Sequence, residues 1–245
     1  CSSDLSVAAG EVDQRGVTHR AGEVQVQVRL RQLGEAFREE LFQLFAIEGR
    51  EAQPRIGGFD GDGVFLVGRA TARHLKMPLE GMRVAIQGFG NVGSAAAELF
   101  AQAGAKIVAV QDHTGTLYSA SGLDVAALSA AASHGGMQAF DGAAERPGTE
   151  DFWSLPVDVL IPAALEGQLN AARAKVVTAR MVIEGANGPT TTAADEILAD
   201  RGILVVPDVI ANAGGVIVSY FEWVQDFSSF FWSEDEINQR LEQIL

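Results

Sequence analysis

The sequence is poor in cysteine and in long apolar runs, and each shortage narrows what the chain can be. Its 245 residues include a single cysteine, Cys1, so no internal disulfide can form. A reducing compartment fits this, and we expect a cytoplasmic protein. No run approaches the ~18–20 apolar residues that span a bilayer, so no membrane helix is expected. A start at Cys1 is expected of a trimmed or incomplete chain, with a lipidated N-terminus as the alternative.

Positive charge is also scarce. The chain has 18 Lys and Arg residues against 32 Asp and Glu residues, which gives a formal net charge of -14. This balance argues against a general affinity for nucleic acid or for an anionic membrane surface. The four histidines do not occur at the spacing of metal ligands, so we expect no metal site.

Beyond residue 81, short apolar segments alternate with helical patterns. Strands are expected at 83–87, 106–110, 157–161, 181–183 and 203–206, and helices at 91–103, 124–133 and 191–199. Short apolar strands that alternate with helices indicate a parallel sheet covered on both faces. We therefore predict an α/β fold with a Rossmann-like, doubly wound parallel sheet.

The first 56 residues are heterogeneous and predict a short irregular N-terminal region, a remnant or diverged segment. Within it, residues 24–30 alternate as a strand does, and residues 33–45 have the spacing of an amphipathic helix. Residues 57–63 are expected to form a loop because of their glycine content, and residues 64–75 a helix that ends before Pro78. Residues 57–245 are predicted to form one domain.

The strongest chemical signal is the run Gly88-Phe89-Gly90-Asn91-Val92-Gly93, which follows an expected strand and opens an expected helix. In this context Gly88 allows a tight turn, Gly90 lets the backbone approach a pyrophosphate, and Gly93 lets the helix pack close to the strand. The phosphates would then lie against free N–H groups at the helix N-terminus. The run therefore predicts a dinucleotide-binding domain over residues 57–245.

Asp112 lies 24 residues after Gly88, at the expected end of the second strand. An acidic side chain there accepts hydrogen bonds from the adenosine ribose and repels a 2′-phosphate. NAD is therefore favoured as cofactor, while NADP stays open. The alternative is a turn aspartate with no ligand.

Three more polar turns follow expected strands, at 162–165, 184–190 and 207–215. Ligands bind outside the carboxyl ends of strands in doubly wound sheets, so these turns suggest a site. Asn187 and Asn212 can each donate and accept hydrogen bonds, as a carboxamide or ribose partner must. The alternative for each asparagine is a turn or a helix cap.

Together these motifs resemble the Glu/Leu/Phe/Val dehydrogenase family. The resemblance rests on the segments 84–93 (VAIQGFGNVG), 183–190 (IEGANGPT) and 207–223 (PDVIANAGGVIVSYFEW), and it covers roughly residues 63–245. It implies NAD(P)-dependent oxidative deamination of an amino acid to a 2-oxo acid and ammonia. Glutamate is the expected substrate, because a serine at position 219 suits a γ-carboxylate. Full-length members of the family often form hexamers, so a homo-oligomer is allowed.

The resemblance also assigns roles to residues. Gly88, Gly90 and Gly93 would bind the pyrophosphate, and Asp112 the adenosine ribose. Val216 and Ser219 would face the substrate side chain. The complete set of expected cofactor residues is Gly88, Phe89, Gly90, Asn91, Val92, Gly93, Asp112, Ala163, Ala164, Asn187 and Asn212.

The chain departs from the family pattern in two places. The glycine-rich segment with the catalytic lysine and the segment with the catalytic aspartate are both unrecognisable, so no catalytic residue is identified. The entry segment 59–63 carries Asp60 and Asp62 where the family usually has a threonine and an arginine. The alternatives are therefore a non-catalytic NAD-binding module and an assembly partner that docks through the helix at 33–45.

Overall fold

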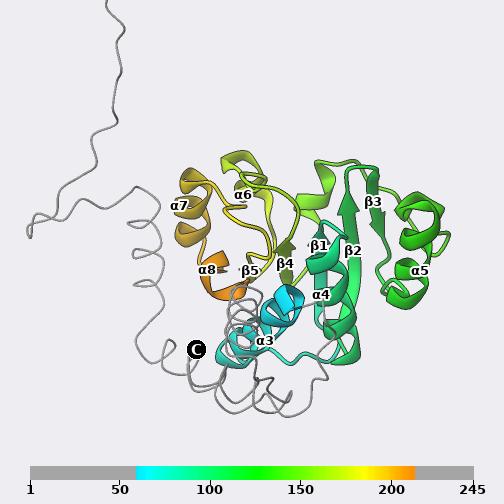
Figure 1. Cartoon of the computed structure of the whole chain (residues 1–245). Helices are drawn as coiled ribbons and strands as arrows, with labels where there is room; N and C mark the ends of the chain where they lie inside the picture. The colour runs from blue at the N-terminus through cyan, green and yellow to red at the C-terminus, as the bar shows by residue number, and fades with distance from the viewer. Residues whose placement is uncertain (1–58, 213–245) are drawn as a thin grey trace, which may run out of the picture.

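The computed structural model describes residues 59–212, and these form a six-stranded sheet with helices on both faces (Figure 1). The strand order is β3-β2-β1-β4-β5-β6. All neighbouring strands are parallel except β2 and β3, which are antiparallel. The strands are β1 (Arg83–Gln87), β2 (Lys106–Asp112), β3 (Gly115–Tyr118), β4 (Val159–Pro162), β5 (Met181–Ile183) and β6 (Leu204–Val206).

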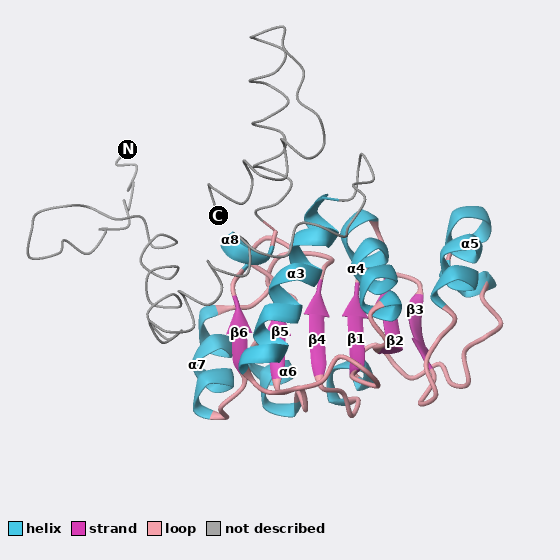
Figure 2. Ribbon diagram, turned by 90° about the horizontal axis from the view of Figure 1, so that it is seen from below, coloured by secondary structure: helices cyan, strands magenta, loops and turns pink. Residues whose placement is uncertain are grey.

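Helices connect the strands and cover the sheet (Figure 2). They are α3 (Phe59–His74), α4 (Asn91–Gln102), α5 (Val125–Gly135), α6 (Ala171–Val176), α7 (Thr192–Asp200) and α8 (Asp208–Ala211), with short 3-10 helices η1 (Met137–Ala139) and η2 (Asp151–Ser154). Local sequence explains several helix starts. Asp124, Asn170 and Thr191 each accept hydrogen bonds from backbone N–H groups in the first turn of α5, α6 and α7.

The sheet separates two hydrophobic clusters, because successive strand side chains point to opposite faces. On one face, Ile86, Ile161 and Ile183 pack with α3, α4 and α5, and Phe100 of α4 is fully buried there. On the other face, alanines and other apolar strand residues pack with η2, α6 and α7 around Trp153, which is 2% exposed. The sheet is therefore buried on both faces, with one hydrophobic cluster on each.

Most expected elements are present, and the α/β fold is confirmed. β2 ends at Asp112, as expected. The sheet is not purely parallel, because β3, which was not predicted, pairs antiparallel with β2. Helix α6 was also not predicted. The loop expected at 57–63 is wrong from residue 59 onward, because α3 begins at Phe59.

One glycine of that segment, Gly61, allows α3 to pack closely against α4. A Cβ added at Gly61 would lie 2.4 Å from the Cβ of Ala95 on α4. The glycine at position 61 is therefore explained by the close approach of α3 to α4 and not by a loop. Several expectations lie outside the described residues: the strand at 24–30, the helix at 33–45, Val216, Ser219, and the side chains of Phe59, Asp60 and Asp62.

Candidate functional site

The turn after β1 can be built only with glycine at Gly88. Its φ angle is +93°, in the region that favours glycine. Its N–H donates to the carbonyl of Gln111 at 2.6 Å, which ties the turn to β2. A Cβ at this position would lie 2.5 Å from the carbonyl oxygen of Ala163, so β1 and the chain after β4 approach too closely for any side chain.

Gly93 has the same requirement from the helix side. A Cβ added there would lie 2.0 Å from the carbonyl oxygen of Gly88. The first turn of α4 therefore sits directly on the β1 turn, as predicted for the last glycine of the motif.

Gly90 differs from both. Its φ of -85° and ψ of -158° are extended values that most residues adopt, and no heavy atom of residues 59–212, apart from its two chain neighbours, lies within 4 Å of an added Cβ. Neither backbone conformation nor packing within the described residues requires glycine here. Gly90 also forms the N-cap of α4 without a side-chain hydrogen bond, so the N–H groups of the first helical turn receive no acceptor from the cap.

The expected site residues occupy the carboxyl ends of the strands. β1 and β4 are neighbours, and the chain after β1 forms α4 on one face while the chain after β4 leads to α6 on the other. This is the point where ligands bind in doubly wound sheets. Ala163 donates its N–H to the carbonyl of Gln87 at 2.6 Å, and a Cβ at Gly185 would lie 3.0 Å from the Cβ of Ala163 and 3.3 Å from Cγ1 of Val92. The structure thus brings the glycine turn, Ala163 and Gly185 together, and we call this region the strand-end site.

Asp112 ends β2 and is held by its own turn. Its Oδ1 accepts hydrogen bonds from the N–H of Thr114 at 2.7 Å and from the Thr114 hydroxyl at 2.5 Å. The ring of His113 is exposed, with Nδ1 3.9 Å from Oδ2 of Asp112. The turn role considered for Asp112 is therefore present. Its role at a ribose stays a prediction that would use Oδ2.

The two expected asparagines lie in contact with each other. Asn212 Nδ2 donates to Asn187 Oδ1 at 2.7 Å, although 25 positions separate them in sequence. The N–H of Gly188 donates to Asp208 Oδ2 at 2.8 Å, and the N–H of Asp208 donates to Oε2 of the fully buried Glu184 at 3.0 Å. The turns after β5 and β6 are thus tied to each other. The roles of Glu184 and Asp208 were not predicted, although both residues lie at strand ends where such side chains meet.

A series of hydrogen-bonded polar side chains also lies on the face of the sheet that is covered by η2, α6 and α7. Gln87 Nε2 donates to Gln168 Oε1 at 3.2 Å, and Arg173 Nη1 donates to the carbonyl and to Oε1 of Gln168 at 2.6 and 3.3 Å. Arg173 binds both carboxylate oxygens of Glu150, at 2.6 and 3.1 Å. The hydrogen bond from Arg173 lowers the pKa of Glu150; slight burial opposes this and the charge of Arg173 adds to it. Its guanidinium also lies 4.7 Å from the centre of the Trp153 ring.

The lysines of the described part lie away from the strand-end site. Lys76 follows α3, Lys106 begins β2 at its amino end, and Lys175 belongs to α6; all three are exposed. Within residues 59–212, no group of three or more His, Cys, Asp or Glu side chains could hold a metal ion. No helix in that range is long and apolar enough to cross a membrane.

The strand order and the glycine turn at the carboxyl end of β1 define a protein with a Rossmann-like, doubly wound α/β fold. Residues 57–245 match the sequence profile of the Glutamate/Leucine/Phenylalanine/Valine dehydrogenase family. The chain belongs to this family.

Curated relatives agree with this membership. Glutamate dehydrogenase of Thermotoga maritima is 53% identical over 163 residues, which cover 66% of this chain and 39% of the relative. The NADP-specific glutamate dehydrogenase A1 and the NAD-specific glutamate dehydrogenase A of Halobacterium salinarum are each 42% identical, over 82% and 80% of this chain and 48% and 43% of their own lengths. The chain thus spans less than half the length of these relatives.

A solved structure shows the same fold. The hetero-hexameric glutamate dehydrogenase from Thermus thermophilus, in its Leu-bound form, superposes with a TM-score of 0.69 at 37% identity, over 78% of this chain and 45% of that one.

Proposed function

We propose that this chain supplies the dinucleotide-binding domain of a glutamate dehydrogenase-type oxidoreductase, which converts L-glutamate to 2-oxoglutarate and ammonia with NAD(P). The observation that carries the proposal is the contrast within the glycine motif. Gly88 and Gly93 are required by the protein's own backbone, whereas Gly90 has no atom of the described chain near an added Cβ. A glycine with this freedom is explained by a ligand whose phosphates approach the backbone.

In this proposal the pyrophosphate lies between Gly90 and the N-terminus of α4, where backbone N–H groups and the helix dipole favour negative charge. Phe89, Asn91 and Val92 complete the turn around it. Ala163 and Ala164 flank the dinucleotide after β4, and Asn187 and Asn212 hold its nicotinamide end. A bound NAD(P) would supply the hydride acceptor for the oxidation of the amino acid, and Asn187 and Asn212 would hold and orient its nicotinamide ring.

We propose NAD as the preferred form. Asp112 keeps Oδ2 for a ribose hydroxyl while Thr114 occupies Oδ1, and a carboxylate so close to the ribose repels a 2′-phosphate. Relatives of both specificities match the chain at equal identity, so this preference needs its own measurement. Val216 and Ser219 are proposed to contact the glutamate side chain.

The test is a titration of the purified 245-residue chain with NADH and with NADPH, followed by nucleotide fluorescence. We expect saturable binding, tighter for NADH. Glutamate and NAD are then added to the same sample, and absorbance is followed for reduction. Binding without turnover supports a domain that needs a catalytic lysine from elsewhere, whereas turnover assigns the chemistry to this chain alone. Absence of binding overturns the proposal.

A further inference from the structure

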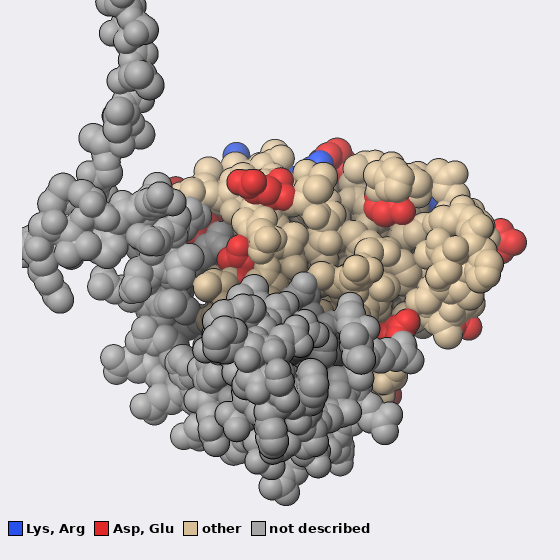
Figure 3. Space-filling model, viewed as in Figure 1, with Lys and Arg blue, Asp and Glu red and all other residues tan. Residues whose placement is uncertain are grey.

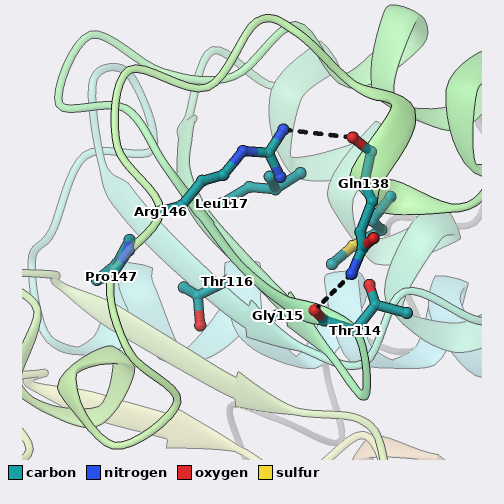
Figure 4. Close-up of a pocket in the computed structure, with 8 residues that line it drawn as sticks. Thr114, Gly115, Thr116, Leu117, Gln138, Arg146 and Pro147 are labelled. Carbon is teal, nitrogen blue, oxygen red and sulfur yellow. Dashed lines mark hydrogen bonds between the residues drawn. The ribbon is translucent and has the colours of Figure 1, made fainter.

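A hollow lies beside β3, outside the strand-end site. It has a volume of about 500 Å³ and is lined by Thr114, Gly115, Thr116, Leu117, Met137, Gln138, Arg146 and Pro147 (Figure 4). Pockets for small molecules fall in the range of roughly 300–1,000 Å³, so the size suits a ligand. Leu117 and Met137 are 1% and 2% exposed, and they give the hollow an apolar floor.

Hydrogen bonds hold the walls of the hollow in place. Gln138 Nε2 donates to the carbonyl of Thr114 at 3.0 Å, which joins η1 to the turn between β2 and β3. Arg146 Nη2 donates to the carbonyls of Phe140 and Gln138 at 2.6 and 3.5 Å, which joins the segment before η2 to η1. Figure 4 shows the Arg146 side chain reaching the backbone carbonyl of Gln138, while the Gln138 side chain extends to the carbonyl of Thr114. The hollow is therefore preformed.

The charge of the hollow is unusual for this protein. Arg146 is the only charged residue in the lining, and within residues 59–212 its hydrogen bonds go to carbonyls and to no carboxylate. Both of these bonds use Nη2, so the N–H groups of Nη1 and Nε can donate to a ligand. Gln138 can likewise donate the second hydrogen of its amide. The chain has a net charge of -14, and acidic side chains predominate on the described surface visible in Figure 3. Against this background Arg146 gives the hollow a local positive charge, and N–H donors come from two of its walls. Arginine binds phosphate oxygens in such settings, often with two parallel hydrogen bonds.

We propose that the hollow binds the phosphate group of a small molecule, with Arg146 and Gln138 as its donors. Thr114 links this hollow to Asp112, because its N–H and hydroxyl both donate to Asp112 while its carbonyl accepts from Gln138. The phosphate has two sources: a separate phosphorylated metabolite, or the 2′-phosphate of NADP reaching past Asp112. The second source rests on the proposed function, whereas phosphate binding itself does not.

The first experiment needs no dinucleotide. The full chain is titrated with inorganic phosphate at constant ionic strength, and backbone amide shifts of Gly115 and Gln138 are followed by NMR. Saturable shifts are expected. Arg146→Gln should weaken the affinity about tenfold or more, because a charge-assisted hydrogen bond is lost, whereas Arg146→Lys should retain most of it. Arg180→Gln removes an equal charge from an exposed position outside the lining and should bind as the unaltered chain does.

A linear response without saturation would overturn the proposal, and so would equal losses in the Arg146→Gln and Arg180→Gln variants. A normal unfolding midpoint for Arg146→Gln shows that lost binding is not lost folding. NADH and NADPH titrations then assign the source. Weaker binding of NADPH alone in Arg146→Gln assigns the phosphate to the cofactor, and unchanged NADPH binding assigns it to a separate metabolite. If NADH fails to bind, the proposed function fails while the phosphate result stands.

Discussion

The two faces of the sheet achieve close packing by different means. On the α3 and α4 face, small residues bring backbones together, with Gly61 against Ala95 and Gly93 against the carbonyl of Gly88. On the α6 and α7 face, long polar side chains bridge the elements, and Arg173 alone contacts Gln168, Glu150 and Trp153. Backbone contact leaves no freedom to adjust, whereas side chains can relax. A substitution on the α3 and α4 face that pushes a Cβ against backbone should therefore cost more than the loss of a side chain on the α6 and α7 face.

The largest effect is expected for Gly93→Ala. Its Cβ would lie 2.0 Å from a backbone oxygen, so the helix must move away from the turn, at a cost of about 3 kcal/mol or more. Gly90→Ala is the matched control, because the same methyl group comes close to no atom of the part of the chain that the structure describes. Urea unfolding measures both variants. Equal stability of the two would remove the distinction between these glycines.

Arg173→Met should lower the free energy of unfolding by about 1–2 kcal/mol. The charge-assisted hydrogen bonds and the contact of the guanidinium with the Trp153 ring are lost, while a long unbranched side chain is kept. Arg180→Met serves as the control in the same unfolding experiment, because Arg180 is exposed and its side chain makes no such contact with residues 59–212. If Arg173→Met lowered the free energy of unfolding by more than Gly93→Ala does, the expected difference between the two faces of the sheet would be reversed.

Gly68→Ala tests a position on the α3 and α4 face where the added methyl group meets side chains that can move. The added Cβ would lie 2.6 Å from Cζ of Phe100 and 2.7 Å from Cδ1 of Ile183, which are ends of side chains and not backbone. Part of the overpacking cost is offset by the helix propensity of alanine, so we expect a net loss of about 1 kcal/mol in thermal or urea unfolding. A loss as large as that of Gly93→Ala would show that buried side-chain ends are as rigid as backbone.

The smallest effect concerns pH. The folded pKa of Glu150 lies below its ordinary value of 4.5, so its ion pair stabilises the fold above that pH and the contribution is lost as pH falls through the folded pKa. Because Glu150 is 71% exposed, Glu150→Gln should cost less than about 1 kcal/mol at pH 7. The difference from the unaltered chain should vanish in acid. A difference that persists below the folded pKa would assign the loss to packing.

The regular part of the fold was predictable because its signals are local. The strand β1 and the start of α4 are marked by an apolar run followed by the glycine motif, and both lie where expected. β3 was missed because its four residues, Gly115–Tyr118, become a strand only by pairing with β2. The start of α3 was missed because glycine content reads as a loop until the neighbouring helix is known.

The sequence predicted which candidate site residues lie at the ends of strands. It did not predict which of their side chains contact one another. The rule that ligands bind at strand ends selected Asn187 and Asn212. Their mutual hydrogen bond, and the hold of Asp208 on the turn after β5, depend on the order of β5 and β6 in the sheet, which no local pattern contains. The engagement of Asp112 by Thr114 is local, and the turn reading of this residue anticipated it.

The freedom at Gly90 has a consequence for how such a chain diverges. Selection for folding alone would accept many small residues at position 90 and reject them at position 93, although the two positions lie in one turn. A homologue that no longer binds a nucleotide would thus keep its architecture and lose Gly90 first. The residue at position 90 would then distinguish members of the family that bind a nucleotide from members that have lost this binding.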